Sequence, residues 1–115
     1  MLVQVRTDRH IQGHARFVER LQATISSALS RYSPQLTRVE VRLTDENGEK
    51  AIGDDKRCVL EARLSGLKPY AVTYHAPSLH QAINGAIDRL IGRLERHLGR
   101  LRHKKGSISL GQLPT

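Results

Sequence analysis

The sequence has little of what builds disulfides, membrane spans or aromatic binding platforms. Its 115 residues include one Cys, no Trp, one Phe and three Tyr. A single Cys cannot form an internal disulfide. No segment approaches the run of about 18 apolar residues that a membrane span needs, and the first ten residues, MLVQVRTDRH, lack the apolar stretch of a signal peptide. We therefore expect one small, soluble, cytoplasmic domain whose core needs neither disulfides nor metals.

Residues that could support catalysis or metal binding do not form a site. His10 and His14 could share a helix face, but no Cys or carboxylate accompanies them as a further ligand. No ligand spacing links the other histidines, His75, His80, His97 and His103. Cys58 falls on the apolar phase of an expected strand, which is typical of a small core residue. With no phosphate-binding Gly-rich loop and no nucleophile elbow, we expect no enzyme, metal, cofactor or small-molecule substrate.

Acidic residues are scarce outside one segment. The chain carries 19 Lys and Arg against 11 Asp and Glu, a formal net charge of +8. Residues 44–55, TDENGEKAIGDD, hold five of the acids and one Lys, and we expect them to form a solvated hairpin tip. The rest of the surface is then strongly basic, which favours a polyanionic partner.

Hydrophobic periodicity and turn residues define the expected elements. They predict strands at residues 2–6, 37–44, 57–65 and 70–75, and helices at residues 12–32 and 78–105. Residues 37–44 alternate without a break, and residues 57–65 pair back with them across the acidic loop. Pro34 ends the first helix and Ser78 caps the second. The face that each residue of the last strand takes stays open.

This order predicts an α+β fold, a two-layer β-α-β-β-β-α sandwich. A four-stranded sheet carries two helices on one face, because each helix has a single apolar stripe to bury. The first two strands are expected to be parallel, joined by a right-handed crossover, and the later ones antiparallel. The solvated face of the sheet is expected to carry Arg38, Arg42, Arg57 and Arg63. We expect residues 1–106 to form the domain and residues 107–115 a flexible tail.

A basic stripe follows one flank of the last helix. At 100° per residue, five residues gather within about 80°, namely Arg89, Arg93, Arg96, Arg100 and His103. Asp88 and Glu95 lie elsewhere on the helix, and neither has a Lys or Arg three or four residues away. A solvated helix face usually mixes positive and negative side chains. The separation of the basic residues from the acidic ones therefore favours a face that binds a polyanion over one that only contacts solvent.

A second, weaker basic line follows the first helix, at Arg16, Arg20 and Arg31, and two helices in one layer could present both lines to one ligand. A membrane-surface helix is disfavoured, because the apolar stripe lacks Phe and Trp and is needed to cover the sheet. The strand at residues 57–65 has no aromatic residue, so stacking of single-stranded bases is not expected. The modes of RNA binding that remain possible are contacts to phosphates and recognition of folded RNA by its shape.

Several segments carry a resemblance to a known family: residues 3–11, residues 17–21, residues 82–90, residues 93–98 and residues 102–106. In residues 82–90, AINGAIDRL, and 93–98, RLERHL, the chain resembles the bacterial ribosome hibernation factors. That group comprises hibernation-promoting factor and ribosome-associated inhibitor A, formerly called sigma-54 modulation proteins. The resemblance covers residues 2–106. The chain resembles the short members, which lack a C-terminal dimerisation module.

The resemblance implies a fold like that of double-stranded RNA-binding domains. It also implies a partner, the small ribosomal subunit and its ribosomal RNA, bound in the channel of transfer and messenger RNA so that idle ribosomes are silenced under stress. The protein would be a monomer off the ribosome and would not bind membranes. By position, the RNA-binding residues would be Arg89, Arg93, Arg96, Arg100, Lys104 and Lys105, with Arg16 and Arg20 in addition. The sequence departs from the family around Gln12-Gly13 and in the acidic loop.

Two other functions stay open at this point. One is a generic binder of structured RNA that does not need the ribosome. The other is a protein-interaction module that modulates a transcription factor, which would not depend on ribosomal RNA.

Overall fold

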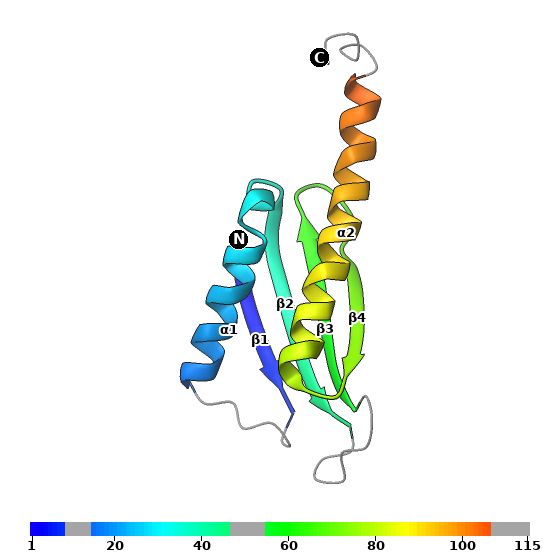
Figure 1. Ribbon diagram of the computed structural model, residues 1–115. Coiled ribbons are helices and arrows are strands. Elements are labelled where there is room, and N and C mark those ends of the chain that lie inside the picture. Colours follow the sequence, from blue (N-terminus) through cyan, green and yellow to red (C-terminus); the bar gives the residue numbers. More distant parts are fainter. Residues whose placement is uncertain (9–14, 47–54, 107–115) are drawn as a thin grey trace.

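The structure, a computed structural model, describes residues 1–8, 15–46 and 55–106, and of residues 99–106 only the backbone. Its elements are β1 Leu2–Thr7, α1 Ala15–Ala28, the 3₁₀ turn η1 Ser30–Tyr32, β2 Leu36–Asp45, β3 Lys56–Leu64, β4 Tyr70–Ala76 and α2 Leu79–Gly106. Figure 1 shows both helices on one face of the sheet. This arrangement confirms the predicted α+β fold.

The four strands follow one another in chain order, β1-β2-β3-β4. β1 runs parallel to β2, and β2, β3 and β4 are antiparallel neighbours, as the sequence predicts. Both β1 and β4 are therefore edge strands. α1 packs against β1, whereas α2 packs against β3 and β4 and lies over the β4 side of the sheet (Figure 1).

The prediction of one helix over residues 12–32 is wrong at its C-terminal end, and residues 12–14 lie outside the described part of the chain. α1 ends at Ala28, and the chain continues through a 3₁₀ turn in which the amide of Tyr32 donates to the carbonyl of Leu29 at 2.9 Å. Pro34 has no amide hydrogen, so it cannot donate the next helical bond, and the last turn closes with shorter-range bonds.

The start of α2 follows the sequence prediction. The amide of Gln81 donates to Oγ of Ser78 at 3.1 Å, and that hydroxyl lies 3.2 Å from Oε1 of Gln81. Ser78 is thus the N-cap of α2: its hydroxyl accepts from an amide that has no partner within the first helical turn, and it donates to the side chain of Gln81. Neither of the two described helices is long and apolar enough to cross a lipid bilayer.

The core lies between the sheet and the two helices. Val39, Val41 and Leu43 of β2 face it, and all three are almost fully buried. Leu94 of α2 is also fully buried, so the apolar phase of this helix points at the sheet as predicted. Cys58 lies in the same core, and burial raises the pKa of its thiol to about 12. It is therefore a protonated core residue at neutral pH.

The prediction that the whole acidic segment is solvated is wrong at the base of the β2-β3 hairpin. Asp45 and Asp55 belong to this segment, yet both are buried. The Nζ of Lys56 lies 2.9 Å from Oδ2 of Asp55 and 3.4 Å from Oδ1 of Asp45, so the two buried carboxylates share one positive charge. The hydrogen bond from Lys56 holds the pKa of Asp55 below its ordinary value. Residues 47–54 lie outside the described part of the chain.

Candidate nucleic-acid interface

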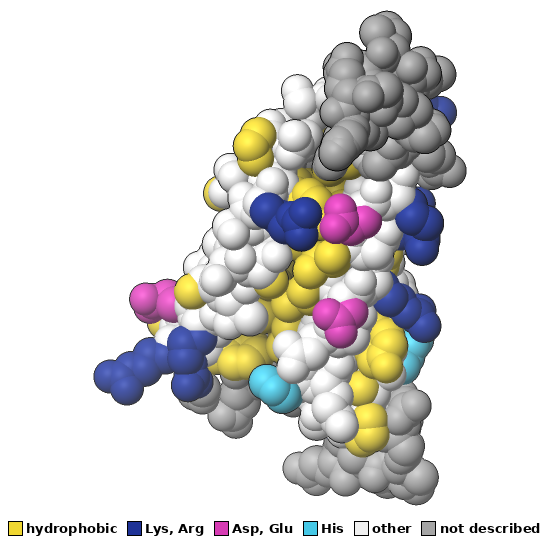
Figure 2. Space-filling model, turned by 45° about the horizontal axis from the view of Figure 1, so that its top comes forward, with side chains coloured by type: hydrophobic (Ala, Val, Ile, Leu, Met, Phe, Trp, Pro, Cys, Tyr) yellow, Lys and Arg dark blue, Asp and Glu magenta, His cyan; other side chains and the backbone are white. Residues whose placement is uncertain are grey.

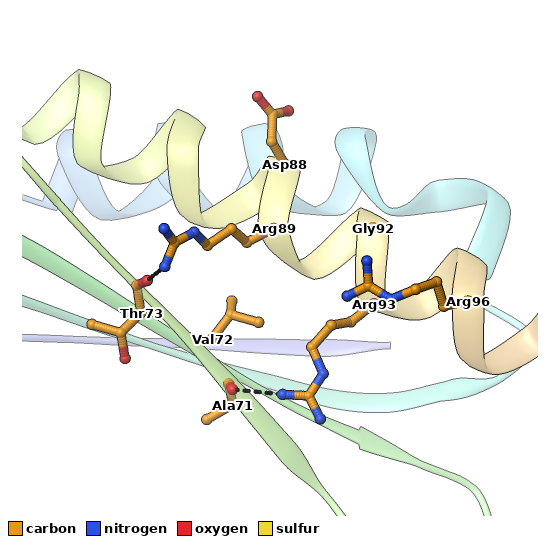
Figure 3. Close-up of a pocket in the computed structure, with 8 residues that line it drawn as sticks. All are labelled: Ala71, Val72, Thr73, Asp88, Arg89, Gly92, Arg93 and Arg96. Carbon is orange, nitrogen blue, oxygen red and sulfur yellow. Dashed lines mark hydrogen bonds between the residues drawn. The ribbon is translucent and has the colours of Figure 1, made fainter.

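A groove runs along the line where α2 meets the outer edge of β4. Its volume is about 540 Å³, and its lining consists of Ala71, Val72, Thr73, Asp88, Arg89, Gly92, Arg93 and Arg96. Figure 3 shows Arg89 and Arg93 reaching from α2 to the backbone of β4, while the side chain of Arg96 lies alongside the helix. The sequence placed Arg89, Arg93 and Arg96 on one flank of the helix, and the structure brings this flank to the edge of the sheet.

Two of these arginines are bound to the edge strand. Nη1 of Arg89 donates to the carbonyl of Thr73 at 2.8 Å, and Nη1 of Arg93 donates to the carbonyl of Ala71 at 3.3 Å. Both carbonyls belong to β4, an edge strand whose outer carbonyls have no strand partner. The arginines therefore occupy part of the free edge of the sheet.

The same two arginines lie over aromatic rings. The guanidinium carbon of Arg89 is 5.0 Å from the ring centroid of Tyr74, and that of Arg93 is 4.5 Å from the ring centroid of Tyr70. Cation–π attraction favours this arrangement. Each guanidinium group therefore covers part of a tyrosine ring, which leaves less of the ring open to stacking with a base.

The charge of the groove is not neutralised. Arg96 forms no hydrogen bond or ion pair with any described residue, and its side chain is exposed. Asp88 is the acidic residue of the groove lining, and Figure 3 shows its carboxylate projecting away from the three guanidinium groups. A guanidinium carries five N–H donors, so Arg89 and Arg93 retain donors for a ligand. Guanidinium groups with free donors are well suited to bind phosphate oxygens.

The structure does not join the two basic lines of the helices. Arg16 and Arg20 line a separate depression of about 400 Å³ on α1, together with Glu19. Since α1 packs on β1 and α2 packs on β3 and β4, this depression lies apart from the groove. Figure 2 shows basic side chains at the outer flank of α2 and at the start of α1, with hydrophobic surface between the two helices.

The remaining basic residues have different outcomes. Arg31 lies 3.7 Å from the carboxylate of Glu95 on α2, so the third member of the α1 line is paired with an acid. The backbone of α2 continues through Arg100, Lys104 and Lys105, whose side chains lie outside the description. Their role in RNA binding stays a prediction.

Sequence reasoning missed the part that Tyr70 and Tyr74 play in the site. Their alternation with Val72 places them on the helix-facing side of β4, and this pattern could have identified them as neighbours of α2. The hydroxyl of Tyr70 is buried without a hydrogen-bond partner among the described residues. Burial raises the pKa of Tyr70, and the charge of Arg93 opposes that shift.

The described residues include no group of three or more His, Cys, Asp or Glu side chains that could bind a metal ion. His10 and His14, the weak pair noted in the sequence, lie outside these residues. The arrangement that is present, guanidinium groups beside an open groove, is suited to binding anions.

Comparisons with known proteins agree with this fold. The profile of the family described as Sigma 54 modulation protein / S30EA ribosomal protein matches residues 4–102. The N-terminal domain of Thermus thermophilus Protein Y is 18% identical with a TM-score of 0.66, and the match covers 84% of this chain and 99% of that one. A ribosomal subunit interface protein from Coxiella burnetii is 12% identical with a TM-score of 0.65, covering 86% and 99%. No curated sequence matches this chain.

Proposed function

We propose a function from one premise: the chain belongs to the Sigma 54 modulation protein / S30EA ribosomal protein family. This is a family of non-enzymatic factors, in agreement with the prediction that the protein is not an enzyme. We infer that the protein associates with the ribosome in the cytoplasm. It binds small-subunit ribosomal RNA in the channel of transfer and messenger RNA, and it silences idle ribosomes under stress.

The observation that carries this proposal is the groove between α2 and β4. It places three guanidinium groups, those of Arg89, Arg93 and Arg96, along one line, with free donors and with the nearby carboxylate turned away. RNA offers a row of phosphates to such a line, and contacts to phosphates position a protein on RNA without reading its bases. The covered tyrosine rings fit recognition of folded RNA by shape and phosphate position.

The other basic residues would extend this contact. Arg100, Lys104 and Lys105 continue α2 beyond the groove, towards the end of the helix that projects past the sheet in Figure 1. Arg16 and Arg20 form a second contact region on α1. Because the two regions are apart, we propose that they meet different parts of the RNA. The protein acts as a monomer when it is off the ribosome.

The dependence of binding on salt tests this proposal. If about five phosphates are neutralised, the logarithm of the affinity should fall with the logarithm of the salt concentration with a slope of about −4. The measurement is pelleting of the purified protein with small ribosomal subunits over a series of salt concentrations. A slope near zero would contradict electrostatic recognition of RNA.

Sedimentation of a stationary-phase lysate on a sucrose gradient tests whether the ribosome is the partner. The proposal expects the protein in the ribosomal fractions, and expects it to leave them when ribosomal RNA is digested. Protein found on other RNA and free of ribosomes would instead support a generic binder of structured RNA. Protein whose association survives digestion of RNA would support a protein partner such as a transcription factor.

A further inference from the structure

The face of the sheet without helices holds a pair of neighbouring arginines that sequence reasoning did not connect. Arg6 of β1 and Arg42 of β2 are direct partners in the parallel ladder, and both are exposed. Of these two arginines, the sequence analysis names only Arg42 as a residue of this face. Arg6 joins it because β1 pairs in a register that sets Val3 and Val5 opposite Val39 and Val41.

The other arginines of this face are paired with carboxylates. The N–O distances are 3.2 Å for Arg38 and Glu40, 3.8 Å for Arg57 and Glu46, and 3.7 Å for Arg63 and Glu61. In contrast, Arg6 and Arg42 form no ion pair or hydrogen bond with any residue that the structure describes. Arg38 and Arg63 are also direct ladder partners, but each of them is paired with a carboxylate. Arg6 and Arg42 therefore differ from that pair in lacking an acidic partner among the described residues.

Like charges directly opposite each other on neighbouring strands destabilise a sheet. Carboxylates offset this repulsion for Arg38 and Arg63, but no described carboxylate does so for Arg6 and Arg42. The backbone beneath them is well fixed: Val41 and Leu43, which flank Arg42, are almost fully buried. The row continues from Arg42 across Val59 to Thr73, and both of these neighbours are uncharged. The row thus ends at β4, where the carbonyl of Thr73 accepts the hydrogen bond of Arg89.

We propose that Arg6 and Arg42 form a second phosphate-binding site, which takes the phosphodiester backbone of RNA on the helix-free face of the sheet. Neighbouring strands are about 4.8 Å apart, so two guanidinium groups on them can bind one phosphate or two consecutive ones. The inference rests on the proposed function in one respect, that RNA is the ligand. The domain then contacts RNA at two places, the groove beside α2 and the helix-free face of the sheet.

The chemistry of the face favours RNA over an acidic protein. Protein interfaces are enriched in large aromatic side chains, and the described positions of this face include no Phe, Tyr or Trp. Beside Arg42 on this face lie Val59, which is uncharged, and Glu40, whose carboxylate is already paired with Arg38. The two exposed guanidinium groups therefore complement a polyanion, in a protein whose net charge is +8.

The test compares two variants of the full chain that remove the same charge from the same face. The first is Arg6→Gln with Arg42→Gln, and the control is Arg57→Gln with Arg63→Gln, which removes arginines already paired with acids. Binding to small ribosomal subunits and to protein-free small-subunit ribosomal RNA is measured over a salt series, at a temperature at which every variant is folded. The first variant should reduce the magnitude of the salt slope by about 1.4 to 1.8, since each phosphate contact contributes about 0.7 to 0.9.

The control should reduce the slope by less than half of that amount, and the melting temperature of the first variant should stay or rise because a repulsion is removed.

Equal slopes for the first variant and the wild type would overturn the second site. A change on subunits but not on protein-free RNA would assign the pair to a protein partner and also overturn it. If Arg93→Glu with Arg96→Glu abolishes binding while the first variant binds like the wild type, the groove is supported as the RNA-binding site and the proposed second site is rejected. If neither variant affects binding, the proposed function itself fails.

Discussion

The guanidinium carbon of Arg93 lies 4.5 Å from the ring centroid of Tyr70, while Nη1 of the same arginine donates to the carbonyl of Ala71. The ring and the strand edge together hold this arginine in one orientation before any ligand arrives. An arginine that is already ordered loses less side-chain entropy on binding, so its contact with a phosphate contributes more to affinity. Arg89 has the same arrangement with Tyr74 and Thr73.

Substitution of Tyr70 tests whether the ring supports binding. Tyr70→Leu should weaken binding to small subunits by about two- to fivefold, because a cation–π contact at an exposed site contributes about 0.5 to 1 kcal/mol. Tyr70→Phe keeps the ring and should bind like the wild type. Its free energy of unfolding should stay or rise, since the buried hydroxyl has no partner among the described residues. Equal affinities for Tyr70→Leu and the wild type would show that the ring does not support Arg93.

Two glycines of α2 should respond in opposite ways to the same substitution. A Cβ on Gly85 would lie 2.2 Å from the ring of Tyr74, whereas a Cβ on Gly92 would meet nothing within 4 Å. Gly85→Ala should therefore lower the free energy of unfolding by about 1 to 3 kcal/mol through overpacking. Gly92→Ala should raise it by about 0.5 to 1 kcal/mol, because Ala favours the helix. Denaturant unfolding measures both, and a stabilising Gly85→Ala would show that α2 packs less closely on β4.

Cys58 should be unreactive in the folded protein. Its thiol is fully buried and its pKa is raised to about 12, so almost no thiolate is present at neutral pH. A chromogenic disulfide reagent should label it only as fast as the domain unfolds, and at once in denaturant. Because the folded pKa lies above the unfolded value of 9.0, this residue favours folding less as pH rises above 9.0. Rapid labelling without denaturant would contradict the core that the structure describes.

Asp55 should contribute to stability at neutral pH and lose that contribution in acid. Its pKa is lowered from 3.8 in the folded state by the hydrogen bond from Lys56, so below pH 3.8 the unfolded chain binds more protons. The contribution is full above 3.8 and falls as pH drops through the folded pKa. Asp55→Asn should lower the melting temperature at pH 7 and reduce its fall in acid. A parallel fall in melting temperature for both proteins would show that Asp55 is not bound to Lys56 in solution.

The fold could be predicted because local patterns dictate most of it. The alternation of Val39, Val41 and Leu43 sets both the strand and its buried face, since side chains of a strand alternate with period two. The burial of Asp55 could not be predicted in this way, because it depends on where Lys56 lies after β2 and β3 pair. The end of α1 was missed because the shift to a 3₁₀ turn depends on which short-range bonds form before Pro34.

The candidate site was predictable only within one helix. The period of 3.6 residues places Arg89, Arg93 and Arg96 on one flank, and this requires no knowledge of the sheet. That the flank meets the edge of β4 depends on how α2 crosses the sheet, which the sequence pattern does not contain. The separation of Arg16 and Arg20 from the groove likewise depends on α1 packing over β1. The pairing of Arg6 with Arg42 depends on strand register.

The most direct test of the central claim, that the groove arginines bind ribosomal RNA, is pelleting of Arg93→Glu with Arg96→Glu with small ribosomal subunits. The matched control is Arg31→Glu with Arg63→Glu, which changes the net charge equally at exposed arginines that already contact carboxylates. Surface substitutions change the free energy of unfolding by about 0.5 kcal/mol each, so both variants should be folded, as melts will show. The groove variant should bind at least about a hundredfold more weakly, since each charge-assisted hydrogen bond contributes about 1.5 to 3 kcal/mol. The control should stay within about tenfold of the wild type, having lost only long-range attraction. Equal binding of the groove variant and the control would contradict the account and leave the groove a solvated surface.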